Sequence, residues 1–509
     1  MQFLKSLIFL FGFNFLFVFS ILNSQEKFPI LLQNSDSLLF WEVVNDFPLN
    51  FREWIFAPQM SSLPDILIAI LTTGVRNPNL YLYFHSVFML SLFFGSLILL
   101  NGKDHSQPFR IKKILLSFLF PFLFYFLILD QYFLENQLML NSISPGHHMG
   151  AYVNSLILFC LYRSEFKGKH YLLVFHSILS LASSSFFFFW GIFPVFVVDL
   201  FSQWKNLKLK DWLLRILVLL FVFYSSYRIP KDLNILRSSY LLTERILFSG
   251  IQLPSDLTQI LDGSTLFMIS ILLLIFLGLV FKKWIRIVSP TEKAEVSEHS
   301  QKIDGTLVLY FIVQFVLSSL LILFSKIFFN LNSVRYEFGV YFSFLILLVI
   351  LIPKKLNYLS LGFLPIFIFF NFKNSFKDFM YYTPKSLSCI QEFVPYYSGL
   401  VLSDYWTSRE LFVYSQFSLE TIPLTEKGDQ MIWLGKHSKA LKLEKENPEV
   451  LVFEKKDLKF SVGDWGKPIQ KMDCDKYVLV QLDPDQKQFK LKKDKILKDY
   501  KLWRKALGL

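Results

Sequence analysis

Long apolar runs constrain this chain more than any other feature. Stretches of roughly 20 residues with almost no charge recur along it, as at 80–100 and 306–325, and about 20 apolar residues suffice for a helix to cross a bilayer core. Hydrophobic residues make up 53% of the chain, and 60 residues are Phe. We therefore expect a polytopic helical membrane protein.

The apolar runs predict about eleven transmembrane helices. Residues 1–371 are expected to form an all-α multi-pass domain with a long first outer loop at 24–79. Residues 372–509 are polar enough for a small α/β domain that ends in a basic helix. The predicted spans lie near 4–23, 80–100, 114–130, 150–162, 171–184, 186–202, 212–227, 264–281, 306–325, 337–352 and 356–371.

The basic residues predict the orientation of these spans. Lys and Arg concentrate in alternate loops, as at 101–113, 163–170 and 203–211, and cytoplasmic loops carry such an excess. The amino terminus is then cytoplasmic, and an odd number of spans puts 24–79 and the C-terminal domain together outside. The segment 171–202 decides that parity. It is too long for one span and short for two, so we expect a broken helical hairpin there.

The net charge is +12, and much of it lies in the inner loops and in the tail from Lys487 onward. Apolar residues such as Tyr500 and Trp503 give this tail one helical face. Two alternatives stay open: a helix that binds anionic lipid, and a solvated terminal helix. Nothing resembles a module that reads bases, so nucleic acid is not an expected partner.

The first outer loop is dense in aromatic residues and carboxylates. Asp36 follows the first span closely, and Phe40 and Trp41 come next. A carboxylate at the membrane surface suits a general base that takes a proton from an attacking hydroxyl, whereas an isolated Asp is also a common helix N-cap. Glu42, Asp46 and Asp65 are secondary candidates, and capping is the default role of Asp65.

Two further outer segments carry groups that suit an anionic substrate. His147 and His148 follow a Pro-Gly turn, and either could hydrogen-bond a diphosphate. Arg335 is one of few cations on that face and is a candidate phosphate ligand. The alternatives are interfacial histidines and an arginine that reaches towards the headgroups. Adjacent histidines on a helix diverge, and no ligand spacing predicts a metal site.

The C-terminal segment alternates strand and helix patterns. Strands are expected at 399–404, 450–453 and 477–482, with a helix at 407–415 after the first of them. Cys389 and Cys474 both fall in this segment. They could pair if the domain faces an oxidising compartment, but their spacing does not show it.

This order of features resembles the GT-C class of integral-membrane glycosyltransferases. The resemblance covers most of the chain but is architectural, and its motifs are short. In that class the donor is usually a polyprenyl-phosphate sugar, and an acidic residue of the first outer loop acts as base, which implies Asp36 here. Many members carry an acidic pair at that point, whereas this chain has an isolated Asp36. The matching segments are Trp54-x-Phe56-x-Pro58, Pro64-Asp65, Pro145-Gly146-His147-His148, Arg335-Tyr336 and Ser403-Asp404-Tyr405-Trp406.

The resemblance implies transfer of a sugar to a glycan, lipid or protein acceptor outside the cytoplasmic (inner) membrane of a bacterium, in contact with membrane lipids. A divalent cation is an open cofactor in that class, and the sequence offers no dedicated cage for one. Two alternatives remain: a transporter or flippase, and a non-catalytic component of an envelope assembly. Spans almost free of charge and the lack of a visible repeat count against a transporter.

Overall fold

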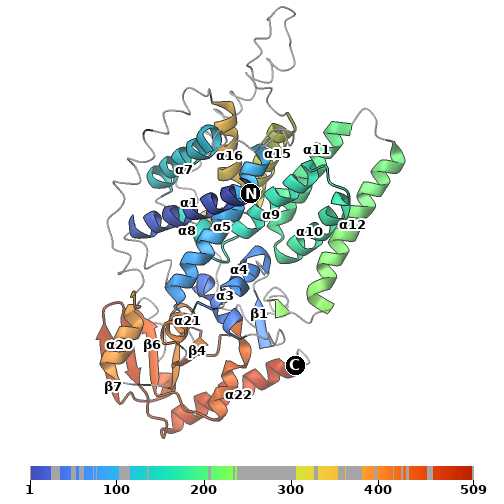
Figure 1. The fold of residues 1–509 in the computed structure, drawn as a ribbon. Coiled ribbons are helices and arrows are strands. Elements are labelled where there is room, and N and C mark those ends of the chain that lie inside the picture. Colours follow the sequence, from blue (N-terminus) through green and yellow to red (C-terminus); the bar gives the residue numbers. More distant parts are fainter. Residues whose placement is uncertain are drawn as a thin grey trace, which may run out of the picture.

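The computed structural model describes most of the chain. The residues it does not describe are 1, 25–34, 47–52, 57–61, 73, 76, 102–114, 135–136, 204–207, 233–235, 238–304, 326–330, 353–361, 363–380, 395–396, 398, 417, 426–427, 432–434, 456–461 and 507–509. The predicted spans 264–281 and 356–371 therefore lie outside the described residues, apart from residue 362. The described part of the chain is mostly helical, with a small sheet region near the C-terminus (Figure 1).

The helical part contains long helices and several short ones. Its elements are α1 (Gln2–Ser24), α3 (Ser35–Asn45), η2 (Ser62–Ile66), α4 (Leu67–Leu71), α5 (Pro78–Asn101), η3 (Leu115–Leu119), α7 (Phe120–Phe133), α8 (Gln137–Ile143), α9 (Met149–Arg163), α10 (Lys169–Ser183), η4 (Phe188–Ile192), α11 (Phe193–Gln203), α12 (Leu209–Asp232), α15 (Gly305–Ser325), η7 (Leu331–Tyr336) and α16 (Phe338–Leu351).

The prediction of about eleven spans is not supported. Among the described residues, three helices are long and apolar enough to cross a membrane: Pro78–Leu100, Lys210–Ile229 and Gly305–Ile322. Four shorter apolar helices accompany them: Ile8–Phe19, Ser117–Gln131, Phe188–Gln203 and Phe338–Leu351. The physical reason is visible in α9, whose 15 residues are mostly buried inside the protein. At about 1.5 Å per residue such a helix falls short of a core of roughly 30 Å.

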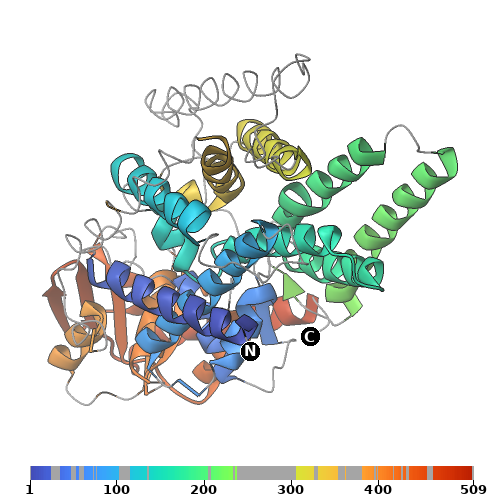
Figure 2. The same cartoon turned by 45° about the horizontal axis from the view of Figure 1, so that its top comes forward.

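Helices α5 and α9 lie at the centre of the helical part and pack against each other. Helix α1 lies against α5, and α15 lies against α16. One apolar core connects these helices, with aromatic contacts such as Phe93 against Phe342, whose ring centroids lie 5.0 Å apart. Figure 2 shows α10, α11 and α12 standing to one side of the other helices.

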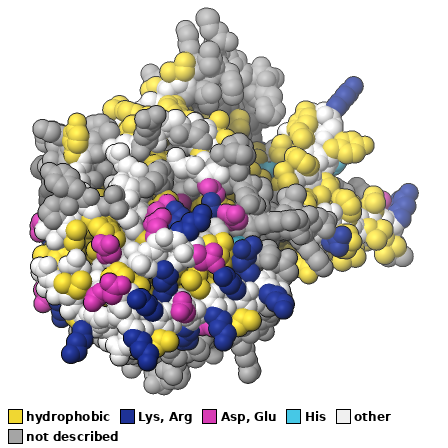
Figure 3. All heavy atoms as spheres, turned by 90° about the horizontal axis from the view of Figure 1, so that it is seen from below, with side chains coloured by type: hydrophobic (Ala, Val, Ile, Leu, Met, Phe, Trp, Pro, Cys, Tyr) yellow, Lys and Arg dark blue, Asp and Glu magenta, His cyan; other side chains and the backbone are white. Residues whose placement is uncertain are grey.

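The segment 171–202 forms two helices, as expected of a broken hairpin. Helix α10 ends at Ser183, and the next helical segment begins at Phe188. Helix α12 lies against α10 and leaves much of its apolar surface uncovered (Figure 3). Such a surface is typical of a helix that faces lipid. Its most exposed large apolar residues are Leu214, Leu217, Leu220, Tyr224 and Tyr227.

The C-terminal part contains a five-stranded mixed sheet in the order β4-β3-β6-β8-β7. The strands are β3 (Leu400–Asp404), β4 (Glu420–Leu424), β6 (Val450–Glu454), β7 (Gln470–Cys474) and β8 (Tyr477–Gln481), and the helical segments are α20 (Lys385–Phe393), α21 (Tyr405–Tyr414), η8 (His437–Glu444), η10 (Val462–Trp465) and α22 (Lys487–Ala506). Strand β3 runs parallel to β4 and β6, and β8 runs antiparallel to β6 and β7. The three predicted strands are confirmed, whereas β4 and β7 were not predicted.

Alternate residues of each strand face opposite sides of this sheet, as a period of two requires. Leu400 and Leu402 join the core beneath α22, whereas Val401 joins the core that contains α20 and α21. Cys389 of α20 and Cys474 of β7 form a disulfide, with their Cα atoms 6.0 Å apart. The sheet is therefore covered by helices on both faces.

The basic helix α22 uses its apolar face inside its own domain. Phe489 and Ile496 lie in the sheet core, and Tyr500 and Trp503 are buried around His437. Its apolar face is thus covered by protein, which favours a solvated terminal helix over a helix that lies in a bilayer with that face.

A second, small sheet joins three distant parts of the chain. Strand β1 (Trp54–Phe56) of the first outer loop pairs in parallel with β2 (Leu236–Arg237) and antiparallel with β5 (Gly435–Lys436). Helix α3 of the same loop packs against α21. Helix α3 and strand β1 of the segment 24–79 are therefore packed against the C-terminal domain.

Candidate functional site

Asp65 is a buried carboxylate in η2, just before α4, and a segment far away in the sequence holds it. Its side chain is 2% exposed. Oδ1 accepts a hydrogen bond of 3.0 Å from the backbone N–H of Gly146, whereas Oδ2 has no hydrogen-bond partner among the described residues. Burial raises the pKa of Asp65 to about 7, and the bond from Gly146 opposes that shift only in part. The carboxyl group is thus poised to exchange a proton near neutral pH.

His85 of α5 faces the same carboxylate. Its Nε2 lies 3.5 Å from Asp65 Oδ1, and the imidazole is fully buried. Neither ring nitrogen has a hydrogen-bond partner among the residues that the structure describes. Buried polar groups are normally paired, so an orphaned imidazole beside a half-satisfied carboxylate is typical of a functional site.

Gly150 makes room for Asp65. A Cβ atom at this position would lie 2.5 Å from Asp65 Oδ2 and 2.6 Å from Pro64 Cδ. These distances are too short for any real Cβ contact, so the first turn of α9 can approach the carboxylate only because residue 150 is glycine. Gly146 has a φ of 77°, a left-handed conformation that also favours glycine.

The backbone around Asp65 is anchored to two helices. The Leu63 N–H donates to Ser183 Oγ of α10 at 2.9 Å, and the Leu63 carbonyl accepts from Asn154 Nδ2 of α9 at 2.8 Å. The Leu63–Pro64 peptide bond is cis. These contacts hold the carboxylate against α9 in a defined position, which suits a residue that must meet a substrate.

The segment 145–148 contacts Asp65 through Gly146 and Tyr336 through His148. His147 Nδ1 lies 2.6 Å from Asn141 Oδ1, the distance of a hydrogen bond that the imidazole donates. The His148 ring packs between Phe186 and Tyr336, with centroid distances of 4.9 and 5.0 Å. The predicted pairs Pro64-Asp65, His147-His148 and Arg335-Tyr336 therefore converge in space.

Arg335 supplies the positive charge of this group. Its guanidinium lies over the Tyr336 ring at 5.0 Å, and Nη2 donates to the Tyr336 hydroxyl at 3.1 Å. Burial, and to a smaller extent the charge of Arg335, lowers the pKa of His148 to about 3. The pKa of His147 is lowered for the same two reasons. At neutral pH both imidazoles are therefore uncharged donors or acceptors beside a permanent cation.

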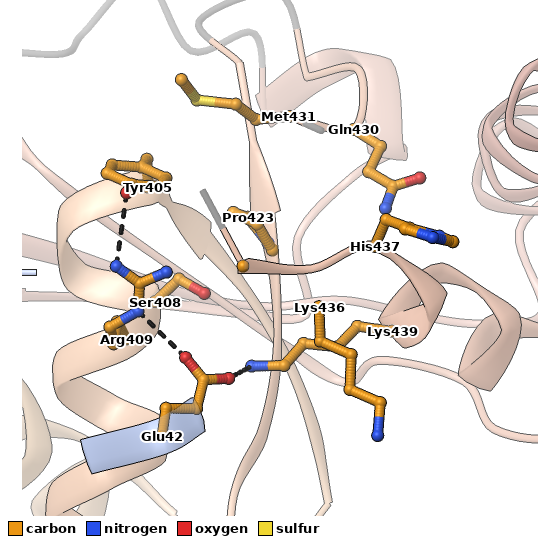
Figure 4. A pocket seen from close by; sticks show the side chains of 11 residues that line it. Glu42, Tyr405, Ser408, Arg409, Pro423, Gln430, Met431, Lys436, His437 and Lys439 are labelled. Atoms are coloured by element: carbon orange, nitrogen blue, oxygen red, sulfur yellow. Dashed lines mark hydrogen bonds and ion pairs between the residues drawn. The ribbon is translucent and has the colours of Figure 1, made fainter. Parts of the chain in front are cut away.

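Glu42, a secondary candidate for the base, is paired with two cations of the C-terminal domain. Arg409 Nε of α21 lies 3.0 Å from Oε2, and Lys439 Nζ lies 2.6 Å from Oε1 (Figure 4). Burial alone would raise the pKa of Glu42, but the charges of Lys439 and Arg409 outweigh it and hold the pKa below its usual value. Glu42 stays ionised, and both its oxygens are engaged.

Asp46 is likewise engaged, and the side chain of Asp36 lies outside the described residues. Asp46 Oδ2 accepts from Trp54 Nε1 at 2.8 Å, and Oδ1 lies 2.9 Å from Lys436 Nζ. Asp36 is the second residue of α3, one residue after the helix begins. Asp404, from the last matching segment, caps α21 by accepting from the N–H groups of Trp406 and Thr407.

Sequence reasoning missed four residues that define these surroundings: His85, Gly150, Arg409 and Lys439. His85 was the easiest to find, because a histidine inside an apolar run is costly without a partner. Gly150 lies two residues after His148, which ends the predicted segment 145–148. Arg409 and Lys439 carry no local signal, since they meet Glu42 only through the fold.

No group of three or more His, Cys, Asp or Glu side chains that could hold a metal ion occurs among the described residues. The carboxylate of Asp65 can accept or donate a proton. Beside it, the neutral imidazoles of the 145–148 segment and the guanidinium of Arg335 can bind an anion. No family model matches this sequence, and no curated protein matches it.

Proposed function

We propose that this protein is an integral-membrane glycosyltransferase that moves a sugar from a polyprenyl-phosphate donor to an acceptor on the outer side of the membrane. The observation that carries the proposal is Asp65, a buried carboxylate with one unpaired oxygen and a pKa raised to about 7. Such a group suits a general base at neutral pH. The architecture that resembles the GT-C class supplies the choice of reaction.

In the proposed reaction an acceptor hydroxyl attacks the anomeric carbon of the donor sugar. Asp65 Oδ2 takes the hydroxyl proton as the new carbon–oxygen bond forms. The bond between the anomeric carbon and the phosphate oxygen breaks, and the polyprenyl phosphate leaves with the electron pair. Arg335 would neutralise the phosphate charge, and His148 would donate a hydrogen bond to it, whereas His147 donates its single N–H to Asn141 and positions the segment.

Asp65 is preferred over the other acidic residues of the loop for a physical reason. A base needs an oxygen that is free to accept a proton, and Glu42 and Asp46 both sit in ion pairs. Asp36 stays the second candidate, as the resemblance implies. The outer location is part of the proposal, and the disulfide between Cys389 and Cys474 supports it, because such bonds persist in oxidising compartments.

The test is the profile of lipid-linked and surface glycans in cells that lack this gene. Rescue is attempted with wild type, Asp65→Asn, Asp36→Ala and Glu42→Gln, each matched for abundance in the membrane. The proposal expects a missing sugar that wild type restores and Asp65→Asn does not. Restoration by Asp65→Asn but not by Asp36→Ala would transfer the role of base to Asp36. An unchanged profile in the deletion would reject glycosyl transfer and favour transport or envelope assembly.

A further inference from the structure

A cleft lies where the first outer loop meets the C-terminal domain, and the reaction above does not use it. It encloses about 250 Å³. We call it the junction cleft, and it is lined by Glu42, Asn45, Asp46, Trp54, Phe412, Glu420, Lys436, Ser438, Lys439 and Lys442. Four of these residues come from the loop and six from the domain, so the cleft exists only when the two are docked.

The charges of the junction cleft cancel. Its walls carry three carboxylates and three ammonium groups, so the formal charge is zero. They are already paired: Lys436 Nζ lies 2.9 Å from Asp46 Oδ1, Lys439 Nζ lies 2.6 Å from Glu42 Oε1, and Lys442 pairs with Glu420. An anionic or cationic ligand would have to compete with these pairs, whereas a neutral ligand could bind without breaking them.

The walls nonetheless offer many hydrogen-bonding groups around a small space. Carboxylate oxygens accept, ammonium groups donate, and the Ser438 hydroxyl and Asn45 amide can do both. Phe412 adds aromatic surface, with Lys439 Nζ 3.9 Å from the centroid of its ring, whereas Trp54 is 1% exposed and lies buried in the wall. Donors and acceptors interleaved beside aromatic surface match a ligand whose hydroxyls both donate and accept and whose ring carbons are apolar.

The geometry points to the junction cleft as the binding site for a neutral sugar residue of the acceptor. This inference rests on the proposed function, because it assigns the substrate that the transferase would extend. Since α3, β1 and the C-terminal domain line the cleft, a bound acceptor would contact both the soluble domain and the segment 24–79, which also contains Asp65. The domain would then select the acceptor, while the helical part holds the lipid-linked donor.

Binding to the purified full-length protein in nanodiscs tests the inference first. The probes are neutral trisaccharides (cellotriose, mannotriose and chitotriose) and, as an anionic comparison, trigalacturonate, all measured by saturation-transfer NMR and calorimetry. We expect at least one neutral trisaccharide to bind with a Kd that changes less than twofold between 50 and 500 mM salt. No ionic contact is gained on binding, although the Debye length falls from roughly 14 Å to roughly 4 Å over this range. Binding of trigalacturonate alone, weakened by salt, would overturn the neutral-ligand assignment.

Two substitutions test whether the trisaccharide binds in the junction cleft. Asn45 is exposed, and its side chain bonds only its own helix, so Asn45→Trp should fill the rim without disturbing the core and raise Kd at least tenfold. Glu420→Gln removes an accepting carboxylate and should raise Kd by a smaller factor. Asn447→Trp, the same change at an exposed position outside the cleft, is the matched control. Equal Kd values for Asn45→Trp and Asn447→Trp would overturn the inference.

Asp65→Asn separates this inference from the proposed function. It should abolish transfer and leave trisaccharide binding unchanged. In transfer assays Asn45→Trp should raise the KM for the acceptor about tenfold with little change in kcat. Transfer with an unaltered acceptor KM in Asn45→Trp would reject the cleft as acceptor site and leave the transferase standing. Trisaccharide binding to a protein that transfers no sugar would reject the transferase and reduce the cleft to a lectin-like site.

Discussion

Two buried carboxylates of the segment 24–79 have opposite surroundings. Glu42 is 5% exposed and meets two cations from the C-terminal domain, whereas Asp65 is 2% exposed and meets one backbone N–H and one imidazole. The pKa of Glu42 is lowered, and that of Asp65 is raised to about 7. Burial acts on both in the same direction, so the nearby charges decide which carboxylate stays ionised.

Under the proposed function, the difference separates a structural carboxylate from a reactive one. A carboxylate that two cations hold ionised ties two parts of the fold together and has little tendency to change its protonation. A carboxylate without a countercharge costs free energy when ionised, and it is retained where a proton must be moved. Composition alone does not separate the two, because both are acidic residues among aromatic ones.

Loss of transfer in Asp65→Asn is the largest effect that the comparison predicts. The amide cannot accept the acceptor proton, and general-base catalysis is typically worth about 10²–10⁴ in rate. We expect kcat for sugar transfer in isolated membranes to fall by that factor while the protein remains folded. Glu42→Gln should keep its kcat per folded molecule. Similar kcat losses in both variants would erase the distinction between the two sites.

Loss of stability in Glu42→Gln comes next. The substitution leaves Arg409 and Lys439 short of a buried counterion, and breaking such a pair typically costs about 3–5 kcal/mol. We expect a clearly lower Tm by calorimetry of the detergent-solubilised protein. Glu454→Gln is the control, because its pair with Lys476 is at the surface, where Lys476 is 46% exposed, and such a pair is worth about 1 kcal/mol or less. An unchanged Tm in Glu42→Gln would contradict the structural role.

The difference in stability between Asp65→Asn and wild type should depend on pH. The folded pKa of Asp65 is raised above its usual value of 3.8 to about 7. The neutral form therefore stabilises the fold below pH 4, and this contribution is lost as pH rises through 7. Asn is neutral throughout, so the variant should match wild type at pH 4 and exceed it at pH 8, by an amount on the order of 3 kcal/mol. Lower stability than wild type at both pH values would contradict a buried, uncompensated carboxylate.

A smaller loss of activity is expected from Gly150→Ala. The new methyl group would overlap Asp65 Oδ2 and Pro64, so the carboxylate must shift, and a misplacement of about 1 Å can cost about a hundredfold in rate. We expect kcat/KM to fall by roughly ten- to a hundredfold. Gly12→Ala, a helical glycine whose Cβ would meet nothing within 4 Å, should be silent. Full activity in Gly150→Ala would mean that the position of Asp65 is not critical.

Local sequence patterns predicted much of this arrangement. The segments Pro64-Asp65, 145–148 and 335–336 were singled out by residue type, and the fold brings them together. The strand at 399–404 and the helix after it were readable from periodicity. The apolar face of α22 was also predicted, but the surface that it packs against was not. An apolar face of a helix alone does not distinguish packing in a protein core from contact with a bilayer.

Two predictions failed because a local sequence pattern does not show what a residue will pack against in the fold. Glu42 and Arg409 are 367 residues apart, and no local pattern reveals such a pairing. Among the described residues the number of spans was overestimated because apolar runs mark burial of any kind, and a helix such as α9 is buried in protein and too short to span. Hydrophobicity indicates where water is excluded without saying what replaces it.

The titration of the two carboxyl groups tests the central claim most directly. Infrared difference spectra of the protein in nanodiscs, recorded from pH 3 to 9, would compare wild type with Asp65→Asn and with Glu42→Gln. The account predicts that the carboxyl band missing from Asp65→Asn titrates near pH 7, whereas the band missing from Glu42→Gln titrates below pH 4.5. A band that titrates near pH 4 for Asp65 would contradict a poised base at this site.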